Sequence, residues 1–239
     1  IASCLVGSEM CIRDSPYTRP PIARSTMRRL HLFLPHLPLH LALARRSEPS
    51  PLPGPLVLGG RPWSPGSVID ADPSARALGV RRGMPLGSAH RLVPEATFID
   101  PDPEADRGAA EAVFEALGRS SPSLAGSVDT RSVSFGLFEV GIDGLGPLWG
   151  AEPVLAERLV DAVTTALPGE VRPRVGIAGT HFVATIAAMA AEPAAPLIVP
   201  AGDEAAFLAD RPSGLLTTDL DVRARLTRFG LRRIGQVAE

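Results

Sequence analysis

The sequence contains no lysine, and all 24 of its basic residues are arginine. This absence excludes a Walker-type phosphate-binding loop, which needs a lysine. Alanine, glycine and proline are abundant as well, which is typical of a GC-rich coding sequence. The preference for arginine over lysine therefore does not itself indicate a function. The 26 acidic residues bring the net charge to −2, and the chain has no overall basic field that attracts nucleic acid. Any contact with DNA must come from local clusters of arginine.

Cysteine is also scarce, because Cys4 and Cys11 are the only two. A disulfide framework is therefore excluded for the rest of the chain. Both cysteines lie in residues 1–26, which have no helical or strand period and lack the form of a signal peptide. The run SCLVGSEMCIRDS resembles a translated sequencing adapter. We predict that residues 1–26 are a non-native or disordered extension and that the protein starts at Met27.

Long apolar runs, nucleophile motifs and clustered metal ligands are missing too. No stretch reaches the roughly 20 apolar residues of a membrane span, so we expect a cytoplasmic protein. There is neither a G-x-S-x-G elbow nor a complete dinucleotide-binding fingerprint. His31, His36 and His40 are close in sequence, but Pro38 interrupts the helical spacing of the last two, and no cysteine or paired carboxylate is near. We therefore predict no metal site.

From Met27 onward, short apolar strands alternate with helices. Apolar runs bounded by glycine and proline predict strands, and a 3.6-residue period predicts helices. We predict an α+β fold, in which helices flank a mixed sheet and a small helical unit follows at the C-terminus. The expected strands are residues 28–35, 54–60, 97–102, 132–141, 172–179 and 196–200, and the expected helices lie within residues 74–92, 103–117, 151–167, the stretch after Gly179, 202–210 and 219–239.

Residues 172–193 have the order of a strand, a glycine turn and an alanine-rich helix, which is how many proteins bind phosphate. We expect Gly176 and Gly179 to permit the turn, and Thr180 or a neighbour to cap the helix. A phosphate site normally adds a basic side chain, but His181 is the only basic residue after Gly176 in this stretch. Two interpretations remain open, namely a phosphate-binding turn that has lost its charge and a tight turn that serves core packing alone.

Three segments, in this order, resemble the Y-family, or translesion, DNA polymerases. DPSARALGVRRGMP at residues 72–85 is similar to the family's YEARKFGVxxGMP segment. VGIAGTHFVATIAA at residues 175–188 is similar to its GIAxNKxLAKxAS segment, and RLTRFGLRRIGQVA at residues 225–238 resembles the helix-hairpin-helix of its thumb. The resemblance implies a polymerase-like palm and fingers over residues 27–200 and the start of a truncated helical thumb over residues 201–239.

Nucleotidyl transfer in this family needs two Mg²⁺ ions, which the resemblance assigns to a D-x-D pair after the first strand and a D-E pair on a later strand. Here Phe33 and Pro35 occupy the first pair of positions, and Ser134 and Phe135 occupy the second. The resemblance therefore implies no catalytic carboxylates, no bound metal and no cofactor, and Mg²⁺ would be needed only if this alignment is wrong. We interpret the nearby Glu139 as a solvated acid at a strand end.

The resemblance also implies where phosphates would bind. Thr180 and His181 occupy the family's Asn-Lys positions, and Thr185 replaces the helix lysine that binds the incoming triphosphate. Arg76 matches an arginine that contacts nucleotide phosphates, although a helix-surface arginine is the alternative. Backbone amides at the Gly230 turn would assist DNA binding. The candidate residues for phosphate or DNA binding are Arg76, Gly176, Gly179, Thr180, His181, Thr185, Arg228, Arg232 and Arg233.

Apolar residues in the acidic positions are similar to one branch of the family, the ImuB-type proteins of bacterial damage-induced mutagenesis. That resemblance implies a DNA-repair adaptor of the SOS response, located at the nucleoid. Its implied partners are damaged primer-template DNA, the sliding clamp, an error-prone replicative-type polymerase and a RecA-like accessory protein. Two alternatives remain open. One is an active translesion polymerase whose acids lie elsewhere, and the other is an enzyme that binds a small phosphorylated molecule at the turn near Gly176.

Overall fold

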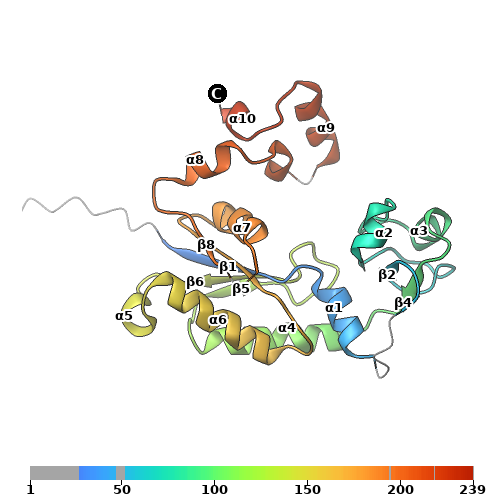
Figure 1. Cartoon of the computed structure of the whole chain (residues 1–239), viewed down its shortest axis with the longest axis horizontal. Helices are drawn as coiled ribbons and strands as arrows, with labels where there is room; N and C mark the ends of the chain where they lie inside the picture. The colour runs from blue at the N-terminus through green and yellow to red at the C-terminus, as the bar shows by residue number, and fades with distance from the viewer. Residues whose placement is uncertain (1–26, 47–51, 194, 218, 239) are drawn as a thin grey trace, which may run out of the picture.

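The described residues form a mixed five-stranded sheet at the centre of the fold (Figure 1). The computed structural model describes residues 27–46, 52–193, 195–217 and 219–238, and the predicted extension over residues 1–26 lies outside them. The strands are β1 (Arg29–Phe33), β5 (Leu124–Gly126), β6 (Leu137–Gly141), β7 (Arg174–Ala178) and β8 (Leu197–Ile198). The order is β5-β6-β1-β7-β8, with β1 antiparallel to both neighbours and β8 parallel to β7.

The two faces of this sheet are covered by different helices. Leu30 and Leu32 of β1 are fully buried in the core formed with α4 (Pro103–Gly118) and α6 (Glu152–Ala166), which lie on one face. Successive side chains of a strand alternate between faces, so His31 points to the other face. There α7 (His181–Ala190) packs across β7 and β1.

A smaller sheet of three described strands lies to the right in Figure 1. It consists of β2 (Leu56–Leu58), β3 (Asp70–Ala71) and β4 (Thr97–Ile99), and its order is β3-β2-β4. Two short helices cover it, α2 (Pro73–Ala77) and α3 (Leu86–Leu92). Its core is built from small apolar residues such as Val57, Ala75 and Val80. Helix α1 (Leu37–Ala44) joins this unit to the central sheet.

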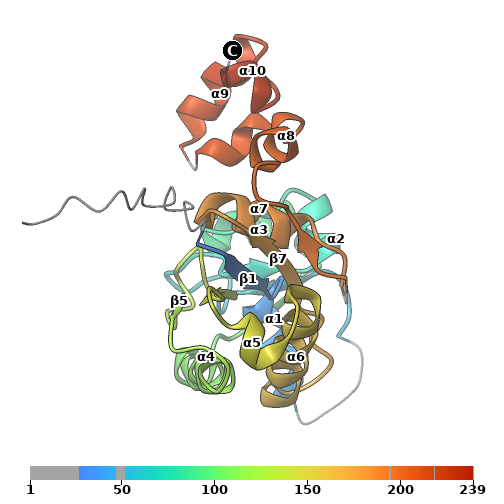
Figure 2. The same ribbon diagram turned by 90° about the vertical axis from the view of Figure 1, so that its left-hand side faces the viewer.

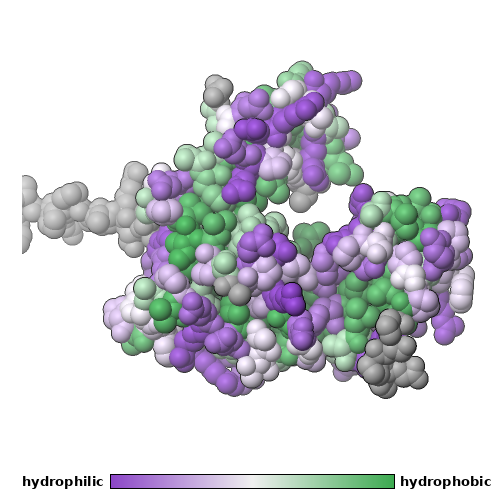
Figure 3. Space-filling view, viewed as in Figure 1, coloured by the Kyte–Doolittle hydropathy of each residue, from purple (hydrophilic) through white to green (hydrophobic). Residues whose placement is uncertain are grey.

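The C-terminal segment forms a separate group of short helices above α7 (Figures 1 and 2). These are α8 (Glu204–Ala209), the 3-10 helix η1 (Ser213–Leu216), α9 (Leu220–Arg228) and α10 (Gly235–Ala238). Gly230 has a φ of 77° in the turn between α9 and α10, which is a left-handed conformation that favours glycine. The space-filling view is hollowed between this group and the α2–α3 unit (Figure 3).

The observed elements confirm the predicted α+β class and the helix-hairpin-helix, with one difference that matters for function. The strand predicted over residues 132–141 begins only at Leu137. Turns precede it, because the amide of Phe135 donates to the carbonyl of Ser132 and Gly136 has a φ of 89°. β3, β5 and the short helix α5 (Gly146–Trp149) were not predicted. None of the described helices is long and apolar enough to span a membrane.

Candidate functional site

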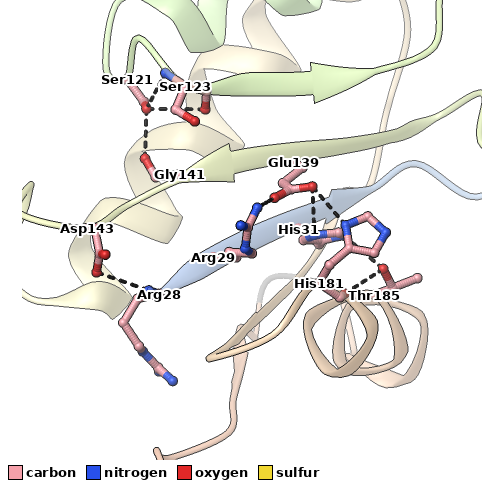
Figure 4. A network of polar contacts seen from close by, with 10 residues as sticks. All are labelled: Arg28, Arg29, His31, Ser121, Ser123, Glu139, Gly141, Asp143, His181 and Thr185. Carbon is pink, nitrogen blue, oxygen red and sulfur yellow. Dashed lines mark hydrogen bonds and ion pairs between the residues drawn. The ribbon is translucent and has the colours of Figure 1, made fainter. Parts of the chain in front are cut away.

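A cluster of polar side chains lies on the face of the central sheet below α7 (Figure 4). His31 is in the middle of β1, directly opposite Glu139 on β6 and Gly176 on β7. His181 and Thr185 are one turn apart on α7, and their side chains reach Glu139 and His31. Elements that are far apart in the sequence therefore meet at this point.

Gly176 allows α7 to lie close to the sheet. It is a residue of β7 rather than of the turn, and neither it nor Gly179 is among the described glycines with a positive φ. A Cβ atom on Gly176 would lie 2.1 Å from the backbone nitrogen of Ala188 and 2.5 Å from the carbonyl oxygen of Ala184. The turn role predicted for Gly176 is therefore wrong. Glycine is required here because the helix backbone approaches the strand too closely for any side chain.

His31 is fully buried, and burial is the main reason that its pKa falls to about 4. The nearby His181 lowers this pKa further, whereas Glu139 opposes the shift. The imidazole is therefore neutral at pH 7. Its Nδ1 lies 3.0 Å from the Thr185 hydroxyl. Its Nε2 has no hydrogen-bond partner among the described residues and lies 3.7 Å from Glu139 Oε2.

Glu139 is surrounded by basic side chains rather than by solvent. It accepts hydrogen bonds from Arg29 of β1 and from Nδ1 of His181, the latter at 2.8 Å. Burial alone would raise the pKa of its carboxyl, but these hydrogen bonds outweigh burial and the pKa falls below its usual value. The interpretation of Glu139 as a solvated acid at a strand end is wrong, because its side chain is only 13% exposed and belongs to the middle of β6.

The four acid positions, Phe33, Pro35, Ser134 and Phe135, lie at the end of β1 and before β6. Phe33 ends β1, and Pro35 follows; both are partly buried. The Ser134 hydroxyl lies 2.8 Å from that of a neighbouring serine, and Phe135 is buried in the core. Side chains two positions apart on a strand lie on the same face of the sheet, so Phe33 shares a face with His31. Two residues of strand place it about 7 Å further along β1.

The N-terminus of α7 is closed by its own side chains. The hydroxyl of Thr180 accepts a hydrogen bond from the amide of Val183 at 3.3 Å, which confirms the predicted helix cap. The exposed His181 bonds Glu139, and the Thr185 hydroxyl donates to the carbonyl oxygen of His181 at 2.9 Å. The two side chains in the family's lysine positions are thus engaged within the protein, and their contact with phosphate remains a prediction.

The other predicted residues near the small sheet do not join this cluster. Arg76 of α2 contacts the imidazole of His36, and Nδ1 of that imidazole lies 2.8 Å from Asp70 Oδ1. His36 has a φ of 56°, in the left-handed region, immediately before α1. Nε2 of His40 lies 3.1 Å from the carbonyl oxygen of Pro168. The structure therefore separates the histidines that are close in sequence, and the phosphate role of Arg76 remains a prediction.

The arginines of the C-terminal hairpin differ from one another. Arg228 and Arg232 are exposed, whereas Arg233 forms an ion pair with Asp210 at 2.6 Å. The amides of residues 230–233 all donate within the hairpin; those of Arg232 and Arg233 share the side-chain oxygen of Gln236. These amides could therefore donate to DNA phosphates, as predicted for the Gly230 turn, only if these hydrogen bonds were broken. Phosphate contacts of this hairpin would have to come from the exposed guanidinium groups.

Comparisons with known sequences agree on one family. The profile of the impB/mucB/samB family matches residues 41–189. The chain is 32% identical over 187 residues to the protein of Dehalococcoides mccartyi named DNA polymerase IV, covering 77% of this chain and 45% of that protein. It is 36% identical over 160 residues to Protein ImuB of Caulobacter vibrioides, covering 67% of this chain and 32% of that protein. The chain thus spans less than half the length of these relatives.

Solved structures share the fold. A crystal structure of DinB from Sulfolobus solfataricus superimposes with a TM-score of 0.71 and 16% identity, covering 89% of this chain and 60% of that one. A post-insertion binary complex of Dbh DNA polymerase superimposes with a TM-score of 0.67, again with 16% identity and the same coverage. At such identities the likeness concerns the arrangement of the chain and not the side chains of the site.

Proposed function

Because the chain belongs to the impB/mucB/samB family of Y-family DNA polymerases, we propose that it is a damage-tolerance protein without nucleotidyl transfer of its own. The observation that carries this proposal is the chemistry of the four acid positions defined above. Mg²⁺ requires oxygen ligands, and the side chains of phenylalanine and proline offer none. Ser134 and Phe135, the two positions before β6, likewise hold no carboxylate.

The acids that remain nearby do not replace the missing pairs. Glu139 is the carboxylate of the cluster below α7, and it is already paired with Arg29 and His181. Asp143 accepts a hydrogen bond from the backbone amide of Arg28, beyond the opposite end of β1. Two-metal catalysis needs ligands that hold two ions about 4 Å apart. A single carboxylate that is bonded to an arginine and a histidine does not meet this requirement.

On this proposal the protein acts as an adaptor at damaged DNA. Residues 27–200 would be the palm and fingers, and residues 201–239 the start of the thumb. The chain would hold primer-template DNA while an error-prone replicative-type polymerase extends it, with the sliding clamp and a RecA-like accessory protein as further partners. The likeness to Protein ImuB of Caulobacter vibrioides supports the adaptor role, and the binary complex among the fold relatives supports DNA as a partner.

Primer extension tests the missing chemistry. The full chain, supplied with Mg²⁺ or Mn²⁺ and all four nucleotides on a primed template, is expected to give no extended product, while a gel shift on the same samples is expected to detect bound DNA. The Dehalococcoides mccartyi polymerase, whole and cut to the matched 187 residues, controls for chain length. Extension that disappears in Glu139→Gln or Asp143→Asn variants would overturn the proposal and assign these carboxylates to catalysis.

A second candidate is an active translesion polymerase. The name DNA polymerase IV, carried by the Dehalococcoides relatives, favours it. It predicts extension that depends on Mg²⁺ and on a carboxylate of this chain. The surroundings of Glu139 argue against it, since one carboxylate beside an arginine and a histidine does not supply the oxygen ligands that two Mg²⁺ ions need.

DNA binding is expected to depend on the exposed arginines of the hairpin. Replacing both Arg228 and Arg232 by alanine should weaken primer-template binding and lower the slope of log Kd against log salt by about 1 to 2, because each lost phosphate contact removes counterion release. Fluorescence anisotropy across a salt series measures the slope. The control is the double variant Arg107→Ala with Arg119→Ala. Both arginines are exposed; Arg107 lies in α4 and Arg119 directly follows it, on the opposite side of the sheet from the hairpin. Equal slopes for the two double variants would rule the hairpin out as a DNA contact.

A further inference from the structure

We propose that His31, Glu139 and His181 form a binding site for one divalent transition-metal ion, preferably Zn²⁺, on the sheet face below α7. One ligand atom from each of the three side chains lies within 4.8 Å of the others. Among the described residues this is the one group of three such side chains that converges this closely. The site is separate from the four acid positions, and it does not depend on the proposed adaptor function.

The donor set selects the class of metal. Two imidazole nitrogens and one carboxylate oxygen are a common zinc set, in which the fourth position stays open. Mg²⁺ prefers oxygen ligands and nearly ideal octahedral geometry, so this site would not bind the magnesium ions of a polymerase. Ligand atoms around a tetrahedral zinc ion lie about 3.3 Å apart. The present separations of 2.8 Å and 3.7 Å from Glu139 Oε2 to the two histidines bracket this value.

The hydrogen bonds of Thr185 determine which nitrogen of His31 can bind the ion. A hydroxyl has one proton, and that of Thr185 is directed to the carbonyl oxygen of His181, which can only accept. The Thr185 oxygen must therefore accept the proton on Nδ1 of the neutral His31. The lone pair of His31 is consequently on Nε2. This is the arrangement by which an outer partner fixes the tautomer of a metal-binding histidine.

An unfavourable contact then remains between His31 and Glu139. Nε2 of His31 is fully buried, has no hydrogen-bond partner among the described residues and lies 3.7 Å from the carboxylate. Two acceptors thus face each other with no proton between them, and a buried polar atom without a partner is costly. A cation bound to both atoms would satisfy both.

The third ligand closes the site from the solvent side. The His181 side chain is 64% exposed at the first residue of α7, and Nδ1 of its ring already reaches Glu139 Oε2. To bind the ion through Nδ1, the ring carries its proton on Nε2 instead, which requires only exchange with water. Arg29 bonds the other carboxylate oxygen, Oε1, which leaves Oε2 for the ion. The fourth position would face solvent beside the helix N-terminus.

Zn²⁺ binding by the full chain tests the proposal. Cys4 and Cys11 are changed to serine in every sample, because thiolates bind zinc by themselves. Isothermal titration is expected to show one ion per chain, and Co²⁺ used as a probe should give the visible absorption of a tetrahedral site. His181→Ala, at an exposed position, should weaken binding at least about tenfold, since loss of outer partners alone costs 10- to 100-fold.

Two further variants make the result decisive. Glu139→Gln should weaken Zn²⁺ binding as His181→Ala does, and His90→Ala, at an exposed histidine of α3, should bind like the parent. Zn²⁺ should raise the Tm of the parent and of His90→Ala by the same amount, and that of His181→Ala by less. No binding to the parent, or equal affinity in the parent and in His181→Ala, would overturn the site. Neither result bears on primer extension, so the two proposals fail independently.

Discussion

Gly176→Ala is expected to lower the free energy of unfolding by at least about 3 kcal/mol, at the upper end of overpacking effects. The new methyl group would lie 2.1 Å from the nitrogen of Ala188, 2.5 Å from the oxygen of Ala184 and 2.6 Å from the carbonyl carbon of Ala187. All three are backbone atoms of α7. A side chain could rotate away from the methyl group, but a helix backbone can only move as a whole. The helix must therefore separate from β7 and β1.

Urea unfolding followed by circular dichroism measures the loss, and Gly108→Ala in the middle of α4 is the matched control. Apart from its own neighbours and the nearby backbone of α4, no atom lies within 4 Å of a Cβ placed on Gly108. That change should stabilise the protein by about 0.5 to 1 kcal/mol, because alanine is the better helix former. A decrease of less than 1 kcal/mol in Gly176→Ala would show that α7 tolerates a wider separation from the sheet than its packing indicates.

The contrast between Gly176 and its neighbour Thr180 illustrates what the sequence could predict. A helix cap is a local feature, read from a threonine directly before an alanine-rich run, and the prediction for Thr180 is confirmed. The function of a glycine depends on what approaches it, and the approach of α7 to β7 is a property of the packed structure. Sequence alone could not distinguish a glycine of the turn from one below a helix.

The polar cluster shows the same limit on a larger scale. His31 and Glu139 lie more than 100 residues apart in the sequence, and His181 follows later still. Their meeting depends on the register of β1 with β6 and on the position of α7, neither of which has a local signal. One signal was present, since a histidine and a glutamate each stand between two apolar residues in an expected strand. Proximity in sequence instead groups His31 with His36 and His40, which the fold separates.

The segment before β6 differs from the predicted strand for another reason. SVSFG combines β-branched and aromatic residues, which favour a strand, and it leads directly into the real strand. The conformation is instead set by Gly136, whose φ of 89° bends the chain, and by the hydrogen bond from the amide of Phe135 to Ser132. Ser134 and Phe135 therefore precede β6, and Phe135 forms only an isolated bridge with Ser127.

Arg45→Ala is the second change with a large expected effect, a loss of about 3 kcal/mol of stability. Arg45 directly follows α1, and its Nη1 donates to Oδ1 of Asp106 in the first turns of α4 at 2.7 Å. The Asp106 side chain is only 1% exposed. Removing the guanidinium would leave a buried carboxylate without its cation, which costs far more than the ion pair gains. Urea unfolding at pH 7 measures the difference from the parent.

The pH dependence of this loss identifies its cause. Burial raises the pKa of the Asp106 carboxyl, and the hydrogen bond from Arg45 opposes that rise. Without Arg45 the folded-state pKa should rise further. As the pH increases above the unfolded-state pKa of about 3.9, the unfolded chain releases its proton first, so folding becomes less favourable until the folded-state pKa is passed. In the variant the pH range between the two pKa values is wider than in the parent. The stability that the variant loses relative to the parent should therefore be small near pH 4 and reach its full size near neutrality.

The neutral variant Asp106→Asn separates the charge from the packing of the arginine stem. In that background Arg45→Ala should cost less than in the parent, and the cost should not change with pH, because no carboxylate remains to titrate. If Arg45→Ala lowers the stability of the protein that keeps Asp106 by the same amount at every pH, Arg45 acts through its methylene groups. A deficit that grows with pH would instead make this ion pair a charged link between α1, next to the small sheet, and α4, below the central one.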